Sequence, residues 1–404
     1  MISYTQALEI IHREFQELSL ETESVNIHSA IYRTLAQDSI ADIDFPPFSN
    51  SAVDGYAVVV SENIRSWNVI DEITAGHFHE IALDEHSAVS IMTGAKIPDG
   101  ASAVIPIEDV DVHEKNITLR PSCSIKVGMN IRRQGEDCVK GTIVLPKGTQ
   151  IQANHIPILS ACGYETVNVL KQLRFGIVVT GDELISMSEK PAGDKLRATN
   201  GESLVEQIKQ LHQRVSSCEI LQDDEEKLSA RMQSLLHSDE HDILLTTGGV
   251  SVGAKDYVQK ILRSLGAEIH FWKASIKPGK PILFASIIKG EKKKFIFGLP
   301  GNPVSVFVNF KIFIEPAVQK IFRQQKQNII FAELTAAEKK HDEKRHFLRG
   351  VLEIDETQKK YFVRSIENQS SGNMFGLGLA NCLIVFKEER MEMQQGETAE
   401  CILI

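Results

Sequence analysis

The stretch that decides the fold is TTGGVSVGAKDY, residues 246–257, which directly follows the apolar run DILL. Its glycines permit positive φ angles, so that successive backbone N–H groups can converge on one anion. A helix expected from about Lys255 would add the positive end of its dipole nearby. The segment is not a P-loop, because GxxxxGK[ST] is absent. The residues alone are consistent both with a tight strand-to-helix connection and with an anion-binding loop.

Strand-like and helix-like segments alternate around this loop, from about residue 173 onward. The apolar runs FGIVVT, DILLTT and KFIFGL are separated by amphipathic stretches such as GESLVEQIKQLHQ and KDYVQKILRSLG. This alternation predicts βαβ units with a mostly parallel sheet, whose ligands collect at the carboxyl ends of the strands. A second loop of this kind, FGLPGNPVS, opens a long helix in which Asn302 is the expected N-cap and Pro303 the first helical residue.

The chain outside this α/β domain, which we place at residues 173–328, predicts three further parts. Residues 46–140 carry short β-like runs between Gly, Pro and Asp, which is typical of a β-rich domain. Residues 1–45 and 141–172 contain helix, loop and strand signals, and we expect them to close into one small domain built from two segments. Residues 329–404 alternate as a small C-terminal β-barrel.

Composition excludes several classes of protein. The 404 residues are 42% hydrophobic and 24% charged, as in a soluble protein of several domains. The net charge of −10 argues against extensive nucleic-acid binding, because the phosphate backbone is also negative. We expect no membrane span and no secretory signal. The six cysteines are scattered without a CxxC pair, which predicts reduced thiols and a cytoplasmic protein.

Charged residues cluster in ways that suit anion chemistry. Lys273, Lys277 and Lys280 fall within the segment FWKASIKPGKPILF, where flanking apolar residues would place the lysines beside a low-dielectric wall. Acidic residues follow turns elsewhere in the chain, at Asp54, Asp137, Glu183, Asp223, Asp224 and Asp256. Each acid alone is explained by a surface or capping role. Beside an anion pocket, however, such acids suggest a divalent cation, with Mg²⁺ as the default.

Seven motifs, in the same order along the whole chain, resemble the MoeA family of molybdenum cofactor biosynthesis, whose eukaryotic counterpart is the E domain of gephyrin. They are NSAVDGYAV, IMTGAKIPDGASAVIPIED, RRQGED, VVTGDEL, TTGGVSVGAKDY, FWKASIKPGKP and GLPGNPVS. The resemblance implies a molybdopterin molybdenumtransferase of four domains. Such an enzyme takes adenylylated molybdopterin and molybdate, releases AMP and leaves the metal on the dithiolene. It also implies a homodimer whose active sites are shared between subunits.

The resemblance assigns residues to the molybdate anion. Lys277 and Lys280 match the molybdate-holding lysines of the family. Arg349 and Ser371 match an arginine and a serine that the C-terminal domain brings to the anion, with Ser370 as the alternative serine. A guanidinium and a hydroxyl can both donate to oxo groups.

The resemblance assigns further residues to the cleavage chemistry. Polar positions whose loss impairs family members match Asp54, Thr93, Asp137, Glu183, Asp223 and Asp256. Of these acids, Glu183 and Asp256 are the first choices as Mg²⁺ ligands, and Lys273 is a candidate for neutralising charge as AMP leaves. We expect the pterin-side phosphate and its surroundings at Thr246, Gly248, Gly249, Ser251, Pro300 and Asn302.

Three alternatives stay open. The α/β domain also resembles the MogA/MoaB adenylyltransferases, which make the adenylylated intermediate and are expected partners of this chain. A non-catalytic scaffold is the second alternative, because the gephyrin E domain also binds receptor tails. Tungstate, which has the same charge as molybdate and nearly the same size, is the third.

Overall fold

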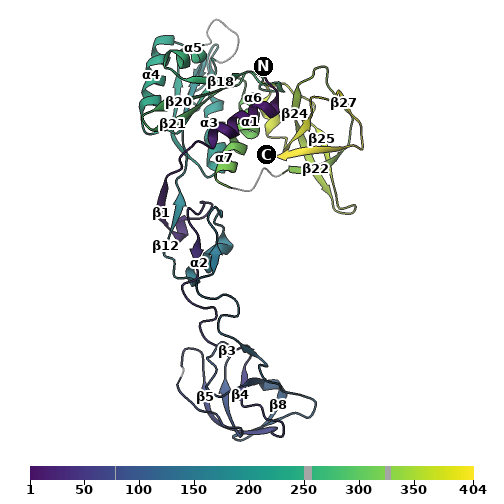
Figure 1. Cartoon of the computed structure of the whole chain (residues 1–404). Coiled ribbons are helices and arrows are strands. Elements are labelled where there is room, and N and C mark those ends of the chain that lie inside the picture. Colours follow the sequence, from purple (N-terminus) through teal and green to yellow (C-terminus); the bar gives the residue numbers. More distant parts are fainter. Residues whose placement is uncertain (78, 250–256, 324–328) are drawn as a thin grey trace. The chain divides into compact units, whose positions relative to one another are not determined.

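The computed structural model describes residues 1–77, 79–249, 257–323 and 329–404, which divide into two compact units (Figure 1). Unit 1 consists of residues 1–36, 148–152 and 167–404. Unit 2 consists of residues 37–147 and 153–166. Both units are therefore assembled from separated segments of the chain. The finer division into four domains stays a prediction.

The α/β part of unit 1 is built on one twisted sheet in the strand order β16-β13-β17-β21-β20-β18. β13, β16, β17 and β21 run parallel, whereas β20 and β18 are antiparallel to their neighbours. The strands are β13 (Arg174–Thr180), β16 (Arg214–Leu221), β17 (Ile243–Thr247), β18 (Glu268–Trp272), β20 (Leu283–Lys289) and β21 (Lys292–Leu299). The mostly parallel sheet expected from the alternating sequence is confirmed.

Helices cover both faces of this sheet (Figure 1). On one face α4 and α5 bury Met232 and Ile261 against Val178 and Ile296 of the sheet. On the other face lie α1, α3 and the run α6–η4–α7, whose middle turns are a π-helix. The helical segments are α1 (Tyr4–Phe15), α3 (Thr199–Gln210), α4 (Glu225–His237), α5 (Tyr257–Ser264), α6 (Pro303–Asn309), η4 (Phe310–Ile314) and α7 (Glu315–Ile321). Parallel strands with apolar side chains on both faces need this double cover.

A small β-barrel ends the chain, as predicted. The strand order β24-β25-β22-β28-β26 is closed by an additional pairing of β26 with β24, and β19 of the α/β part joins β24 at the outside. The strands are β19 (Ile276–Lys277), β22 (Ile329–Leu334), β24 (Arg345–Asp355), β25 (Lys360–Ser365), β26 (Cys382–Phe386) and β28 (Thr398–Leu403). Two short strands, β23 (Glu338–Lys339) and β27 (Glu392–Met393), pair beside the barrel, and the 3₁₀ segment η5 is Met374–Leu377.

Unit 2 contains the β-rich region predicted from the turn-rich sequence. Its main sheet has the order β7-β4-β6-β5-β9-β8. These strands are β4 (Gly55–Val58), β5 (Ser66–Ile73), β6 (Ser87–Ile91), β7 (Ala103–Pro106), β8 (Val110–His113) and β9 (Asn116–Leu119). The unit also contains β2 (Ser39–Ile40), β3 (Asn50–Ser51), η2 (Ile107–Asp109), β10 (Ile131–Arg132), β11 (Ile143–Leu145), η3 (Ala153–His155) and α2 (Ile156–Ala161).

Short pairings complete unit 1. β1 pairs with β12 where the chain passes between the units, and β14 pairs with β15 beside the first βα loop. These segments are β1 (Thr22–Asn26), η1 (Ile27–Ser29), β12 (Thr166–Leu170), β14 (Leu184–Ile185) and β15 (Leu196–Arg197). All six cysteines are free thiols. Within the described ranges, no helix has the length and apolar character that crossing a membrane requires.

Candidate functional site

The carboxyl ends of four parallel strands bring the predicted loops to one edge of the α/β sheet. The loop after β13 contacts the end of β16, because Gly181 N donates to Leu221 O at 3.2 Å. The loop after β17 contacts the end of β21 in the same way, with Gly248 N donating to Leu299 O at 3.1 Å. Ligands of open parallel sheets bind at this edge, so it is the candidate site.

Carboxylates gather on two of these loops. The exposed Glu183 follows β13, and Asp223 follows β16. The backbone N–H of Asp223 donates to Asp182 Oδ1 at 3.1 Å, which ties the two loops together. The described residues contain no group of three or more metal-ligating side chains. Mg²⁺ is usually held by one or two carboxylates and substrate phosphates, so this oxygen-rich pair of loops fits it.

The glycine loop after β17 requires glycine at its first position. Gly248 has φ +89°, and a Cβ there would lie 2.7 Å from both the carbonyl oxygen and the hydroxyl of Thr180. Gly249 also has a positive φ, 63°. Thr246 lies inside β17 and is fully buried, so its side chain is part of the sheet core. Ser251 and Asp256 lie outside the described residues.

The loop between β21 and α6, residues 300–302, contacts the C-terminal barrel. Asn302 is the N-cap residue of α6, but its side chain does not cap the helix. Its Nδ2 instead donates to Ser371 Oγ at 3.0 Å, and Val304 N donates to Ser371 O at 3.3 Å. Pro300, just before, is buried. The structure thus places Ser371, one of the residues assigned to the anion, at the amino end of α6.

A residue that the sequence did not single out holds the second loop in place. Asn200, at the start of α3, is 8% exposed, and its Nδ2 donates to Gly301 O at 2.8 Å. This bond fixes the turn that presents Asn302. Its sequence surroundings, ATNGES, read as an ordinary helix start and give no sign of this contact.

Arg349 is in a different situation from the one expected for an anion ligand. The residue is 1% exposed, and its guanidinium donates to carbonyl oxygens of the loop 368–373. The bonds are 2.6 Å to Asn373 O, 2.8 Å to Asn368 O and 3.0 Å to Ser370 O. Burial lowers the pKa of the Arg349 guanidinium from its usual value. In this structure Arg349 therefore shapes the loop that carries Ser371.

The turn at residues 277–280, here called the lysine turn, presents two exposed lysines around a buried glycine. Lys277 and Lys280 are exposed, whereas Gly279 is buried and has φ +93°. Lys277 lies on β19, which pairs with β24 of the barrel opposite His346. The backbone N–H of Lys273 donates to Ile282 O at 2.8 Å, while its side chain lies over Trp272, with Nζ 3.7 Å from the centroid of the ring.

Unit 2 holds the remaining residues assigned from the resemblance. Asp54 Oδ1 accepts hydrogen bonds from the backbone N–H of Thr93 at 2.7 Å and from its hydroxyl at 2.8 Å. These two bonds lower the pKa of the exposed Asp54 carboxyl, the backbone bond most. Asp137 forms an ion pair with Arg132 on β10. Asp54 and Thr93 are thus brought together although 39 residues separate them in sequence.

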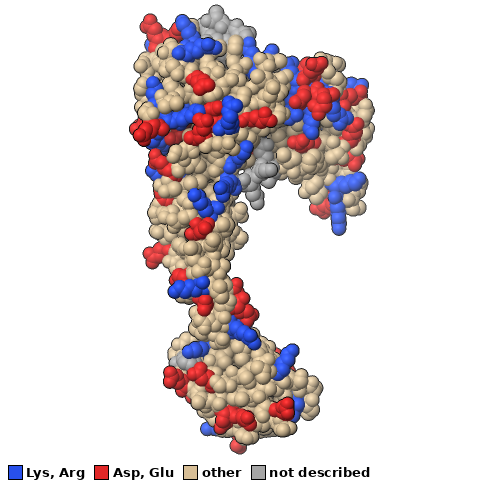
Figure 2. Space-filling model, viewed as in Figure 1, with Lys and Arg blue, Asp and Glu red and all other residues tan. Residues whose placement is uncertain are grey.

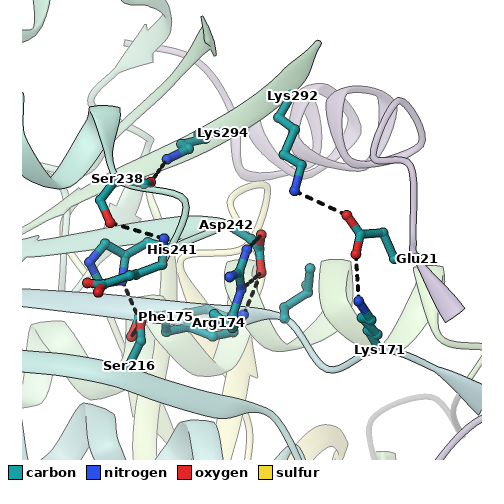
Figure 3. Close-up of polar contacts among 12 residues, drawn as sticks. Glu21, Lys171, Arg174, Phe175, Ser216, Ser238, His241, Asp242, Lys292 and Lys294 are labelled. Carbon is teal, nitrogen blue, oxygen red and sulfur yellow. Dashed lines mark hydrogen bonds and ion pairs between the residues drawn. The ribbon is translucent and has the colours of Figure 1, made fainter. Parts of the chain in front are cut away.

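A cavity of about 590 Å³ lies at the opposite, amino edge of the α/β sheet. Several of its polar side chains bind one another (Figure 3). The Arg174 guanidinium donates to both carboxylate oxygens of Asp242, at 2.8 and 3.1 Å. Glu21 lies between Lys171 at 2.8 Å and Lys292 at 3.1 Å, and these ammonium groups lower its pKa to about 2. These pairs tie strand starts together, so we do not assign the candidate site to this edge.

The face of the molecule shown in Figure 2 carries charges of both signs. Figure 2 shows acidic and basic side chains interspersed on the visible face, without an extended basic stripe. A protein that binds nucleic acid by its phosphates would present such a stripe.

Family comparisons cover most of the chain. Residues 2–163 match the family profile described as the MoeA N-terminal region (domain I and II). Residues 176–320 match a probable molybdopterin binding domain, and residues 332–404 match the MoeA C-terminal region (domain IV). The middle match contains the carboxyl edge of the sheet and the lysine turn.

Individual relatives match along almost their whole length. A molybdopterin molybdenumtransferase of Haemophilus influenzae is 36% identical over 386 residues, covering 94% of this chain and 93% of the relative. One of Staphylococcus aureus is 31% identical over 402 residues, covering 96% and 92%. The crystal structure of a molybdopterin biosynthesis MoeA protein from Pyrococcus horikoshii superposes with a TM-score of 0.82 at 28% identity, with both chains fully covered.

Proposed function

Because the chain belongs to the MoeA family, we propose that it is a molybdopterin molybdenumtransferase. It would insert molybdenum from molybdate into the dithiolene of adenylylated molybdopterin and release AMP. One observation carries the proposal: the acid-bearing and glycine-bearing loops meet at the carboxyl edge of the α/β sheet, where Asn302 binds Ser371 of the barrel. This arrangement combines donors for phosphate oxygens with carboxylates for a cation.

The two exposed lysines of the turn are the proposed molybdate ligands. Molybdate is a small dianion, and the ammonium groups of Lys277 and Lys280 are free to point at it because both side chains are exposed. Ser371 can donate its hydroxyl proton to an oxo group, since its Oγ accepts from Asn302. The role proposed for Arg349 is to hold the loop of Ser371 in position.

The carboxyl edge is the proposed position of the phosphoanhydride. Backbone N–H groups of the glycine loop would bind phosphate oxygens. Glu183 and Asp256, the first choices from the family resemblance, would hold Mg²⁺, with Asp223 as a further carboxylate. The cation, when bound, would neutralise charge on the anhydride oxygens. Lys273, from beside Trp272, is proposed to offset the charge of the departing AMP.

The proposed assembly is a cytoplasmic homodimer with active sites shared between subunits, which also contacts the adenylyltransferase that supplies its substrate. Mixing two impaired variants, assayed at a molybdate concentration far below the half-saturating value of Lys277→Ala, tests the sharing. Asp54→Ala and Lys277→Ala proteins, unfolded and refolded together, should regain about a quarter of wild-type activity if Asp54 and Lys277 of different subunits form one site. Refolded mixtures without activity would mean that each subunit builds its own site.

The main experiment measures AMP release from adenylylated molybdopterin and Mg²⁺, with and without molybdate. Molybdate-dependent release is the expected result. AMP release that ignores molybdate would contradict the proposed insertion. Tight binding of the substrate without AMP release in either condition would favour a scaffold of the gephyrin type. Replacing molybdate with tungstate in the same assay shows whether the site distinguishes the two oxyanions.

A further inference from the structure

We infer that Asn309, a residue deep inside the α/β part, is a positioning residue for the molybdate-binding lysines. This inference rests on the proposed role of Lys277 and Lys280. Asn309 is the last residue of α6 and is 0% exposed. It lies in the run VSVFVNFKIFI, where its neighbours Val308 and Phe310 are fully buried apolar residues. A polar side chain in such surroundings costs free energy unless it forms a hydrogen bond.

The side-chain amide of Asn309 donates a hydrogen bond to the lysine turn. Its Nδ2 donates to Gly279 O at 3.1 Å, while its Oδ1 is buried without a partner among the described residues. Gly279 is the residue between the two lysines in KPGKP, with only Pro278 also intervening. The bond therefore attaches the centre of the turn to the end of α6.

The fit of the turn against Asn309 is close. A Cβ on Gly279 would lie 2.6 Å from Asn309 Nδ2 and 2.9 Å from Oδ1. Glycine is required there for that reason and also because its φ is +93°. The buried turn can therefore pack directly on the amide, and both lysine side chains leave it toward solvent.

The other contacts of the turn act on its two ends. Lys277 is held by the pairing of β19 with β24. The carbonyl oxygen of Lys280 accepts from Ala274 N at 3.1 Å and from Ile282 N at 3.0 Å. Among the described residues, the bond from Asn309 holds the middle of the turn, and so it positions the backbone from which both lysine side chains extend. A displacement of binding groups by about 1 Å is enough to cost a large factor in activity.

The test compares Asn309→Leu with wild type and with Gln207→Leu. Leucine has nearly the shape of asparagine but cannot donate. Gln207 is a matched control, because it is also a buried amide, 7% exposed, and donates to the backbone carbonyl of Ser203. Its Oε1, like Oδ1 of Asn309, has no partner among the described residues. We expect Asn309→Leu to raise the molybdate concentration for half-maximal AMP release about tenfold, with kcat at saturating molybdate changed by less than about twofold. Gln207→Leu should leave that concentration unchanged.

Two further readouts separate positioning from general damage. In Asn309→Leu, hydrogen exchange should become faster in segment 273–283, where two amides depend on the Lys280 carbonyl. Asn309→Asp supplies a conservative rescue, since burial raises a carboxyl pKa and the protonated acid can donate to Gly279 O. Its half-saturating molybdate concentration, relative to wild type at the same pH, should be near normal at pH 6 and increased at pH 8.5.

An unchanged molybdate dependence in Asn309→Leu would overturn the inference, and so would an equal increase in Gln207→Leu. Failure of the proposed function would be detected in the wild-type protein, not in the variants. A wild-type protein that releases AMP without regard to molybdate defeats the proposed function before any variant is compared.

Discussion

Replacing Arg349 with methionine distinguishes two roles that the sequence and the structure suggest for this residue. The family resemblance makes the guanidinium a molybdate ligand, whereas the structure commits it to three backbone carbonyls of the loop 368–373. Methionine keeps most of the length and apolar contact of the arginine stem but removes every donor. If the structural role holds, the substitution loosens the loop that carries Ser371.

The size of the effect follows from the bonds that are lost. A hydrogen bond to a charged group contributes about 1.5–3 kcal/mol, so three bonds set an upper limit of about 4.5–9 kcal/mol. Burying the guanidinium in a residue that is 1% exposed costs several kcal/mol, which methionine recovers. We therefore expect the free energy of unfolding of the barrel to fall by about 3–5 kcal/mol.

The assay has to be local because the chain contains two compact units, and a chain of several units is not expected to unfold in a single two-state transition. Hydrogen exchange of peptides covering residues 366–377 reports the loop, and denaturant titration followed by exchange reports the barrel. Arg364→Met is the matched control, since Arg364 is an exposed arginine on the adjacent strand β25, 3.9 Å from Glu353. Its expected cost is below about 0.5 kcal/mol.

One result would refute this reasoning. If Arg349→Met unfolds within about 1 kcal/mol of wild type and loses only molybdate affinity, the guanidinium contacts the anion itself. Arg349→Lys should recover little of the stability, because one ammonium cannot serve three acceptors arranged for a planar fork.

Three other predictions follow from the same structure. Lys277→Ala should raise the half-saturating molybdate concentration about tenfold at an unchanged Tm, and a normal molybdate titration would remove Lys277 from the site. Gly248→Ala should lower the free energy of unfolding by about 1–3 kcal/mol more than Gly290→Ala, which has nothing within 4 Å of its new Cβ; equal denaturant midpoints would contradict the close packing on Thr180. Burial and Lys320 lower the pKa of His12 from 6.5 to about 4, so its neutral form stabilises the fold above pH 6.5 and this contribution is lost as pH falls toward 4. His12 is only half-buried, so His12→Gln should reduce the loss of stability between pH 7 and pH 5 by about 1 kcal/mol, and urea unfolding curves with the same pH dependence as wild type would disprove the assignment.

The sequence predicted the fold correctly where strand-like and helix-like segments alternate regularly. The alternation of FGIVVT, DILLTT and KFIFGL with amphipathic stretches predicted a parallel sheet, and the structure contains it. The pattern also predicted which edge would carry the loops, because each glycine-rich or acidic turn follows a strand end. These inferences need only the order of residues along a short window.

Side-chain contacts between residues far apart in the sequence could not be predicted in this way. Asn302 has the sequence of an N-cap and occupies that position, yet its side chain binds Ser371, which lies 69 residues further along the chain. Arg349 sits in HFLRG, which reads as a strand, and nothing in those letters shows that the loop 368–373 folds over its guanidinium. A lone asparagine in VSVFVNFKIFI signals a buried hydrogen bond, but the partner, Gly279, is fixed only by the tertiary fold.

The segmented construction of unit 1 has a consequence for how the chain is made. Helix α1 is synthesised before the elements it packs on, because Phe15 stacks on Phe295 at a centroid distance of 4.6 Å, and Tyr4 contacts Phe313 and Phe347. Nearly three hundred residues must be synthesised before the apolar face of α1 has its partners. The 111 consecutive residues 37–147 of unit 2 are complete long before that. We therefore expect unit 2 to fold during synthesis while α1 stays an exposed amphipathic segment, which makes α1 a candidate for chaperone binding.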